Sequence, residues 1–126
     1  MLVYKKLWLT LGWMMVALVF YFSLIPGPPE IKLNFKYIDK VEHFLAYVIL
    51  MGWFSQIYQS NKNRIAYFIF FVSMGVLIEI LQGMGKVRFF EYSDMLANTT
   101  GVTVAWILTR GELKHLLVRF ENKWLN

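Results

Sequence analysis

Apolar residues gather into four long runs along the chain, at residues 7–25, 41–57, 65–81 and 93–108. The first run, "LWLTLGWMMVALVFYFSLI", contains no charged residue. As a helix rising ~1.5 Å per residue, it is long enough to cross ~30 Å of hydrocarbon. The fourth run is weaker, because Asn98 and three threonines interrupt it. The pattern predicts an all-α integral membrane protein whose four spanning helices form a bundle.

Each gap between these runs contains residues that break helices or favour loops. "PGPP" begins at residue 26, "QSNKNR" at residue 59 and "GMGKVRF" at residue 83. Proline lacks the backbone donor that a helix interior needs, and glycine and asparagine are frequent in turns. Lys5 and Lys6 precede the first run as in a signal peptide, but no small-residue cleavage site follows, so we expect this run to be retained.

The tail, residues 110–126, has a different pattern, with apolar residues at helical spacing between basic ones. This pattern predicts an amphipathic helix that lies in the plane of the membrane surface. The alternative is a frayed terminus, because chain ends are often poorly ordered. The apolar positions are Leu113, Leu116, Leu117, Phe120 and Trp124.

Composition supports a lipid environment for the whole chain. Of its 126 residues, 58% are hydrophobic and 17% are charged. A soluble domain of this size buries only ~60–70% of the surface that its unfolded chain exposes, too little to hide this apolar content. The length accommodates one domain, residues 1–126. Because cysteine is absent, disulfides and thiolate chemistry are excluded.

Charge predicts the topology. The formal net charge is +5, but the basic residues are scattered between the apolar runs and form no stripe suited to nucleic acid. The N-terminus, the second loop and the tail together carry 8 Lys and Arg, whereas the first and third loops carry 5. Four spans place both ends on one side, and the positive-inside rule favours the cytoplasmic side.

Polar side chains concentrate where the second, third and fourth runs meet on the side opposite the termini. They occur in pairs three or four residues apart, so both members of a pair project from the same helix face. We therefore expect a single polar pocket near the outer leaflet. The pairs are Asp39 and His43, Glu79 and Gln82, and Asp94 and Asn98. A ridge of small residues, Ala97, Gly101 and Ala105, also predicts close packing of the fourth helix against a neighbour.

Some of these side chains have simpler alternative roles. "DKVE" at residues 39–42 matches a capping box, in which Asp39 is the N-cap. Ser93 or Asp94 could cap the fourth helix in the same way. His43 could hydrogen-bond a backbone carbonyl without any chemistry.

Glu79 fits none of these structural roles. It lies near the C-terminus of its helix, where the helix dipole disfavours a negative charge by ~0.3–1 kcal/mol. An acid within the apolar region costs up to ~2.5–3.5 kcal/mol at full depth. We therefore expect Glu79 to face the protein interior and to have a partner, with His43 or Arg88 the nearest candidates, and we favour a functional role.

Four stretches resemble the VanZ-like family of small bacterial membrane proteins. They are "FSLIPGPP" at 22–29, "DKVEHFLAY" at 39–47, "EILQ" at 79–82 and "RFFEYSDMLANTTG" at 88–101. The resemblance covers residues 20–108 and implies a multi-pass protein of the bacterial cytoplasmic (inner) membrane and cell envelope. The name-giving member of the family is associated with low-level teicoplanin resistance. The motif positions are Asp39, Lys40, His43, Glu79, Gln82, Arg88, Asp94, Asn98 and Gly101.

The polar pocket predicts a site that binds or modifies a lipid headgroup or a lipid-linked envelope precursor. His43, Glu79 and Asp94 are the candidate catalytic groups, because an imidazole and carboxylates can transfer protons. Lys40 and Arg88 would attract phosphate, and Asp39, Gln82 and Asn98 complete the binding set. Because no nucleophile motif accompanies them, the sequence leaves open whether a reaction is catalysed.

Three other functions compete with this prediction. The polar cluster could only lock the bundle of a non-enzymatic structural or accessory protein. One histidine and several carboxylates could hold a metal ion, but the short signatures of such sites are missing, so we expect no metal and no cofactor. A transporter would require more than four short spans, although a homo-oligomer is compatible with the sequence.

Overall fold

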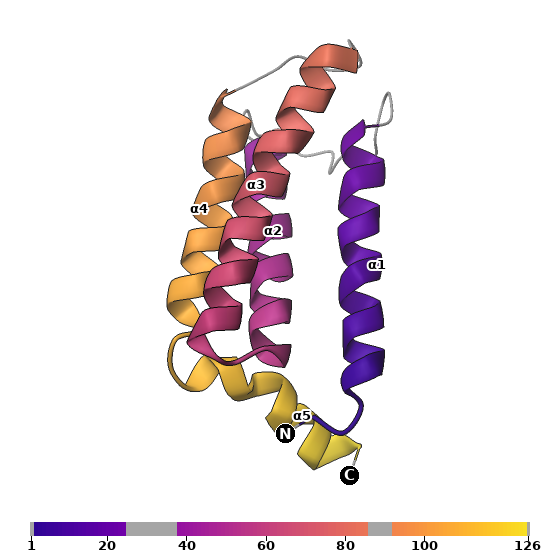
Figure 1. Cartoon of the computed structure of the whole chain (residues 1–126), viewed down its shortest axis with the longest axis vertical. Helices are drawn as coiled ribbons and strands as arrows, with labels where there is room; N and C mark the ends of the chain where they lie inside the picture. Colours follow the sequence, from indigo (N-terminus) through magenta and orange to yellow (C-terminus); the bar gives the residue numbers. More distant parts are fainter. Residues whose placement is uncertain (1, 25–37, 86–91, 126) are drawn as a thin grey trace.

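The computed structural model describes residues 2–24, 38–85 and 92–125, without the side chains of residues 38, 39, 85, 92 and 112. Every regular element within these ranges is helical, which confirms the all-α prediction. Four long helices run alternately up and down, and a short fifth helix crosses the end where both chain termini lie (Figure 1). The elements are α1 (Lys5–Leu24), α2 (Ile38–Ile57), α3 (Asn61–Gly85), α4 (Tyr92–Leu108), the 3₁₀ helix η1 (Glu112–His115) and α5 (Leu116–Trp124).

The predicted apolar runs correspond one to one with the four long helices. Two boundaries were wrong: α3 begins at Asn61, inside the break predicted at residues 59–64, and it continues to Gly85, past the start of the break predicted from Gly83. By length and composition, α1 and the segment Asn61–Met84 of α3 qualify as membrane spans. Helix α4 is shorter, with 17 residues, and α2 begins with charged residues, so these two do not qualify on the same basis.

Helix α2 is the centre of the bundle, since it contacts each of the other helices. Its residues Tyr47, Leu50, Met51 and Phe54 are almost fully buried, together with apolar side chains from α1, α3 and α4. Helix α1 is different, because half of its large apolar side chains are exposed. A continuous exposed apolar face of this size is unfavourable in water but suits contact with lipid tails.

Helices α2 and α4 approach each other most closely at Gly101. A Cβ atom placed on Gly101 would lie 2.4 Å from the carbonyl oxygen of Phe44 and 3.2 Å from the Cβ of Tyr47. Only glycine permits this approach, since a methyl group there would overlap the α2 backbone. The predicted packing role of the small-residue ridge is thus confirmed at Gly101, and α2 is the neighbour.

Polar side chains close the end of the bundle nearest the termini. The Ser60 hydroxyl accepts a hydrogen bond from the Asn63 amide at 3.3 Å, which satisfies a free donor in the first turn of α3. The buried Arg64 guanidinium donates to the carbonyl of Trp106 and, at 3.1 Å, to Thr109 Oγ1. Arg64 therefore binds a carbonyl that the C-terminus of α4 leaves without a helical partner.

The tail is helical and is held against the bundle by two buried side chains, which contradicts the frayed alternative. Gln56 Nε2 donates to the Leu113 carbonyl, and its Oε1 accepts from the Leu117 amide at 2.9 Å. Glu121, fully buried, accepts hydrogen bonds from Trp8 Nε1 at 2.8 Å and from the backbone amides of Val3 and Tyr4. The N-terminal segment and the tail are thereby joined.

The face of the tail that packs against the protein is not the apolar face seen in the sequence pattern. Of the five apolar positions, only Leu117 is buried, in a cluster with Trp8 and Ile57. The other positions remain exposed beside basic residues, because Glu121 and Leu117 occupy the face toward the protein. The exposed apolar residues are Leu113, Leu116, Phe120 and Trp124.

We expect Gly101→Ala to destabilise the protein by about 1–3 kcal/mol, because α2 and α4 must separate to admit the methyl group. Thermal unfolding in detergent measures the change. Gly52→Ala is the matched control, since a Cβ on Gly52 meets no atom within 4 Å and alanine favours the helix. Equal melting temperatures for the two variants would contradict the close packing.

We expect docking of α5 to depend on pH through Glu121. Burial opposes ionisation of this carboxyl, but hydrogen bonds from Trp8 and the Val3 and Tyr4 amides outweigh it and hold the pKa of Glu121 below its ordinary value of 4.5. The stabilisation is therefore present above that value and is lost as the pH falls through the lower pKa of the folded state.

Hydrogen exchange of the α5 amides, corrected for the intrinsic pH effect, measures this loss. Glu121→Gln should increase exchange already at neutral pH, because an amide nitrogen would face donors. Lys123→Gln, at an exposed position of the same helix, should leave exchange unchanged. Protection in Glu121→Gln equal to that of the wild type would show that the carboxylate does not hold the tail.

Candidate functional site

Three ionisable side chains from three helices meet at the end of the bundle opposite α5. His43 comes from α2, Glu79 from α3 and Asp94 from α4, and one potential ligand atom from each lies within 4.8 Å of the others. Glu79 is fully buried, which confirms that it faces the interior. We call these three side chains the polar triad. They lie within two turns of the helix ends that Figure 1 shows beside the grey segments, and Asp94 lies in the first turn of α4.

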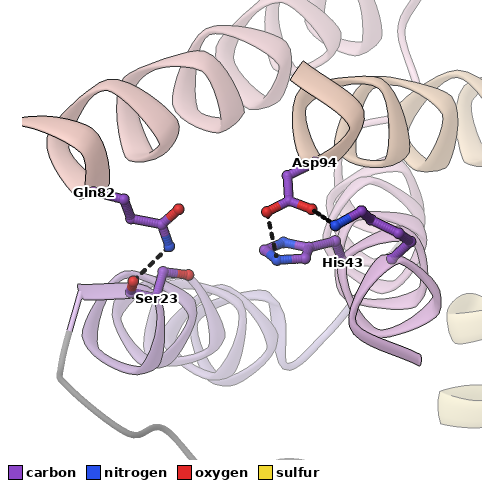
Figure 2. Close-up of polar contacts among 5 residues, drawn as sticks. Ser23, His43, Gln82 and Asp94 are labelled. Carbon is purple, nitrogen blue, oxygen red and sulfur yellow. Dashed lines mark hydrogen bonds and ion pairs between the residues drawn. The ribbon is translucent and has the colours of Figure 1, made fainter. Parts of the chain in front are cut away.

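The carboxylate of Asp94 faces two residues of α2. Its Oδ1 lies 2.7 Å from Lys40 Nζ, and its Oδ2 lies 3.7 Å from His43 Nε2. Lys40 and His43 are three residues apart and so share a helix face. Figure 2 shows the carboxylate directed at the imidazole. The described contacts of Asp94 thus join α4 to α2.

A second polar layer lies one helical turn deeper, at Tyr47 on α2 and Asn98 on α4. Both side chains are 1% exposed. The Tyr47 hydroxyl and both amide atoms of Asn98 have no hydrogen-bond partner among the described residues. Asn98 packs on α3 at Gly75, where a Cβ would lie 3.2 Å from Asn98 Nδ2. Tyr47 is close enough to Glu79 to interact with it electrostatically.

An apolar groove leads to the polar triad along the face between α1 and α2. It has a cavity volume of about 400 Å³. Its walls are mostly apolar, with Met15, Leu18 and Val19 from α1 and Ala46 from α2. His43, Glu42, Tyr47 and Ser23 are its polar lining residues. The groove therefore provides an apolar surface for a chain and a polar end for a headgroup.

Gln82 was predicted to join the same pocket, but its described contact is with α1. Its Nε2 donates to the Ser23 carbonyl at 2.6 Å. In Figure 2 this bond is separate from the contacts between His43 and Asp94. Gln82 therefore connects α3 to the end of α1, where the carbonyls of the last turn lack helical partners.

Two predicted site residues cannot be placed. Arg88 lies outside the described residues, as do its neighbours Lys86 and Glu91. The backbone of Asp39 belongs to the first turn of α2, but its side chain lies outside the described set. Tyr47 was missed as a candidate because it reads as part of the apolar run. Its signal was its spacing of four residues from His43 on one helix face.

The described cluster is acidic, since the carboxylates of Glu42, Glu79 and Asp94 accompany one ammonium group, that of Lys40. The imidazole beside two carboxylates can accept or donate a proton. The same three side chains could hold a divalent cation. Buried carboxylates in an apolar environment require such partners, because desolvation penalises an uncompensated charge.

Comparison with known families now identifies the chain. The model of the VanZ/LLP1 family matches residues 4–117. The chain belongs to this family. The match confirms the resemblance seen in the motifs. It extends the resemblance back to Tyr4 and forward through η1 to Leu117 in α5. Neither curated proteins nor solved structures provide a match.

Membership in the VanZ/LLP1 family, together with the apolar helices α1 and α3, identifies a membrane protein. The family motifs coincide with the geometry of the site. Lys40, His43, Glu79 and Asp94 are motif positions that lie in or beside the polar triad, and Gly101 is the motif position that permits the approach of α4 to α2.

Proposed function

We propose that this VanZ-like envelope protein binds the polar head of a lipid or a lipid-linked envelope precursor at the polar triad. The observation that carries the proposal is the groove between α1 and α2, whose apolar walls lead to His43. An amphiphile matches this surface, because its chain would lie on Met15, Leu18 and Val19 while its head reaches the imidazole. Ligand sites combine such apolar walls with a few polar groups that orient the ligand.

Each polar group has a role in this proposal. Lys40 and Arg88 attract phosphate oxygens, and Glu79 and Asp94 accept hydrogen bonds from headgroup hydroxyl or amine groups. His43 lines the groove and belongs to the triad, so it is the group that meets the ligand first. If the ligand is modified as well as bound, His43 with either carboxylate supplies the proton transfer.

The proposal includes a topology in which all four long helices span the bacterial inner membrane. The charged ends of α2 and α4 are compatible with spanning, because those residues contact one another inside the bundle, as Lys40 does Asp94. The bias of Lys and Arg supports an orientation with both termini and α5 in the cytoplasm and the triad near the outer leaflet. There the exposed apolar side chains of α5 would enter the lipid interface.

A second function is favoured by the helix-to-helix contacts of the same residues. Lys40 with Asp94 joins α2 to α4, and Gln82 with Ser23 joins α3 to α1. A polar network of this kind could serve only to lock the bundle. Against it, a lock should satisfy its own polar atoms, whereas the Tyr47 hydroxyl and the Asn98 amide lack partners among the described residues. A ligand would provide them.

Filling the groove tests the binding proposal. We expect Leu18→Trp to reduce crosslinking of a phospholipid carrying a photoreactive tail by about tenfold, the effect of losing ~1.4 kcal/mol of binding free energy. Leu18 lines the groove and is half exposed, so the larger ring is accommodated without disturbing the core. Leu11→Trp, on the same helix outside the groove-lining residues, is the control. Equal crosslinking in both variants would eliminate the groove as the binding surface.

The double variant His43→Gln with Glu79→Gln distinguishes binding from a structural lock. We expect it to remain folded in detergent and to abolish any change in teicoplanin susceptibility that expression of the wild-type chain produces in a bacterial host. If the cluster is only a lock, the double variant instead loses about 1–3 kcal/mol of stability, because buried polar atoms lose their partners. Melting temperature and susceptibility, measured on the same variant, separate the two outcomes.

A further inference from the structure

We propose that the polar triad is a binding site for a divalent metal ion, with Zn²⁺ as the matching ion. His43, Glu79 and Asp94 offer one imidazole nitrogen and two carboxylate oxygens, the donor types that bind Zn²⁺ in proteins. The three ligand atoms lie within 4.8 Å of one another. Each comes from a different helix, so the site needs the assembled bundle.

The distance between His43 and Asp94 fits a shared ion. His43 Nε2 and Asp94 Oδ2 are 3.7 Å apart, which is too long for a hydrogen bond. Two ligands of one Zn²⁺, each at ~2.0–2.2 Å from the ion, lie roughly 3–4 Å apart. The observed separation is compatible with a common ion, and Figure 2 shows the two groups facing each other.

Lys40 orients this carboxylate for coordination. It lies 2.7 Å from Oδ1 of Asp94, which leaves Oδ2 directed at His43. Ligating carboxylates in metal sites are commonly held by an outer partner in this way. Before an ion binds, the lysine also offsets part of the negative charge of the two carboxylates.

An independent observation points to a ligand at the same place. The Tyr47 hydroxyl and the Asn98 amide are buried and lack hydrogen-bond partners among the described residues. Each lies one turn from a triad residue, on α2 and α4 respectively, and Tyr47 interacts electrostatically with Glu79. Three protein ligands leave a position of a tetrahedral ion to water. A bound water would provide the hydrogen bonds that these two side chains need.

The metal site is independent of the proposed function, although it concerns the same residues. If a headgroup binds as proposed, the open position on the ion is where a phosphate or hydroxyl oxygen of the headgroup would coordinate. That role rests on the proposed function, whereas binding of the ion does not. The two proposals can therefore fail separately.

Zinc titration of the full chain, purified in detergent without a polyhistidine tag, tests the site. We expect calorimetry and elemental analysis to give one Zn²⁺ per chain. His43→Gln and Asp94→Asn should each weaken binding by at least about tenfold, the effect expected even for outer partners of a metal ligand. His115→Gln is the matched control, because the chain has 2 histidines and this one lies in η1. It should bind Zn²⁺ as the wild type does.

X-ray absorption of the zinc-loaded wild type provides a test that needs no variant to fold. We expect one imidazole nitrogen and oxygen ligands at ~2.0–2.2 Å. The proposal is overturned if the wild type binds no Zn²⁺, if the spectrum lacks imidazole, or if His115→Gln removes binding while His43→Gln retains it. Zinc binding without lipid crosslinking would support the metal site and refute the proposed function, and crosslinking without zinc binding would do the reverse.

Discussion

The close approach of α2 and α4 is the constraint on which the rest of the structure depends. At Gly101 the two backbones are too near for any side chain to intervene. This contact determines how far Asp94, two turns earlier in α4, lies from Lys40 and His43 on α2. Because helices are stiff over two turns, a shift at the glycine would move the carboxylate relative to both partners. The close packing at Gly101 thus sets the distances from Asp94 to Lys40 and His43.

The two ends of the bundle use polar residues differently. At the end near the termini, the buried side chains of Arg64, Gln56 and Glu121 each have hydrogen-bond partners, although Arg64 Nε has none among the described residues. These contacts join helix ends and the tail. At the opposite end, buried polar atoms of Tyr47 and Asn98 lack partners among the described residues. What distinguishes this end is that three ionisable side chains, His43, Glu79 and Asp94, meet beside these atoms.

Much of the fold could be predicted from the apolar runs, because a charge-free stretch longer than a dozen residues has few alternatives to a helix. The meeting of His43, Glu79 and Asp94 followed from their placement at helix ends on one side. The partner of Gln82 and the buried role of Glu121 could not be predicted. Both depend on how a helix is rotated about its axis, which is set by packing with residues distant in sequence.

Glu121 also illustrates why a residue in the tail gives no warning of its role. An isolated glutamate among basic residues on a short terminal helix has the pattern of a solvated surface position. Glu121 is buried only because the tail packs against the N-terminal segment and Trp8. The sequence contains no periodic signal for a contact between the first few residues and the last few.

The bond between the two ends has one more implication. Glu121 binds the N-terminal segment through the backbone amides of Val3 and Tyr4 rather than through their side chains. Almost any residue presents the same amide, so these two hydrogen bonds tolerate substitution at both positions, although the Tyr4 hydroxyl also donates to the Leu125 carbonyl at 3.5 Å. Proline is the exception, since it carries no amide hydrogen to donate. These two hydrogen bonds thus require the carboxylate of Glu121 but no particular side chain at residue 3 or 4.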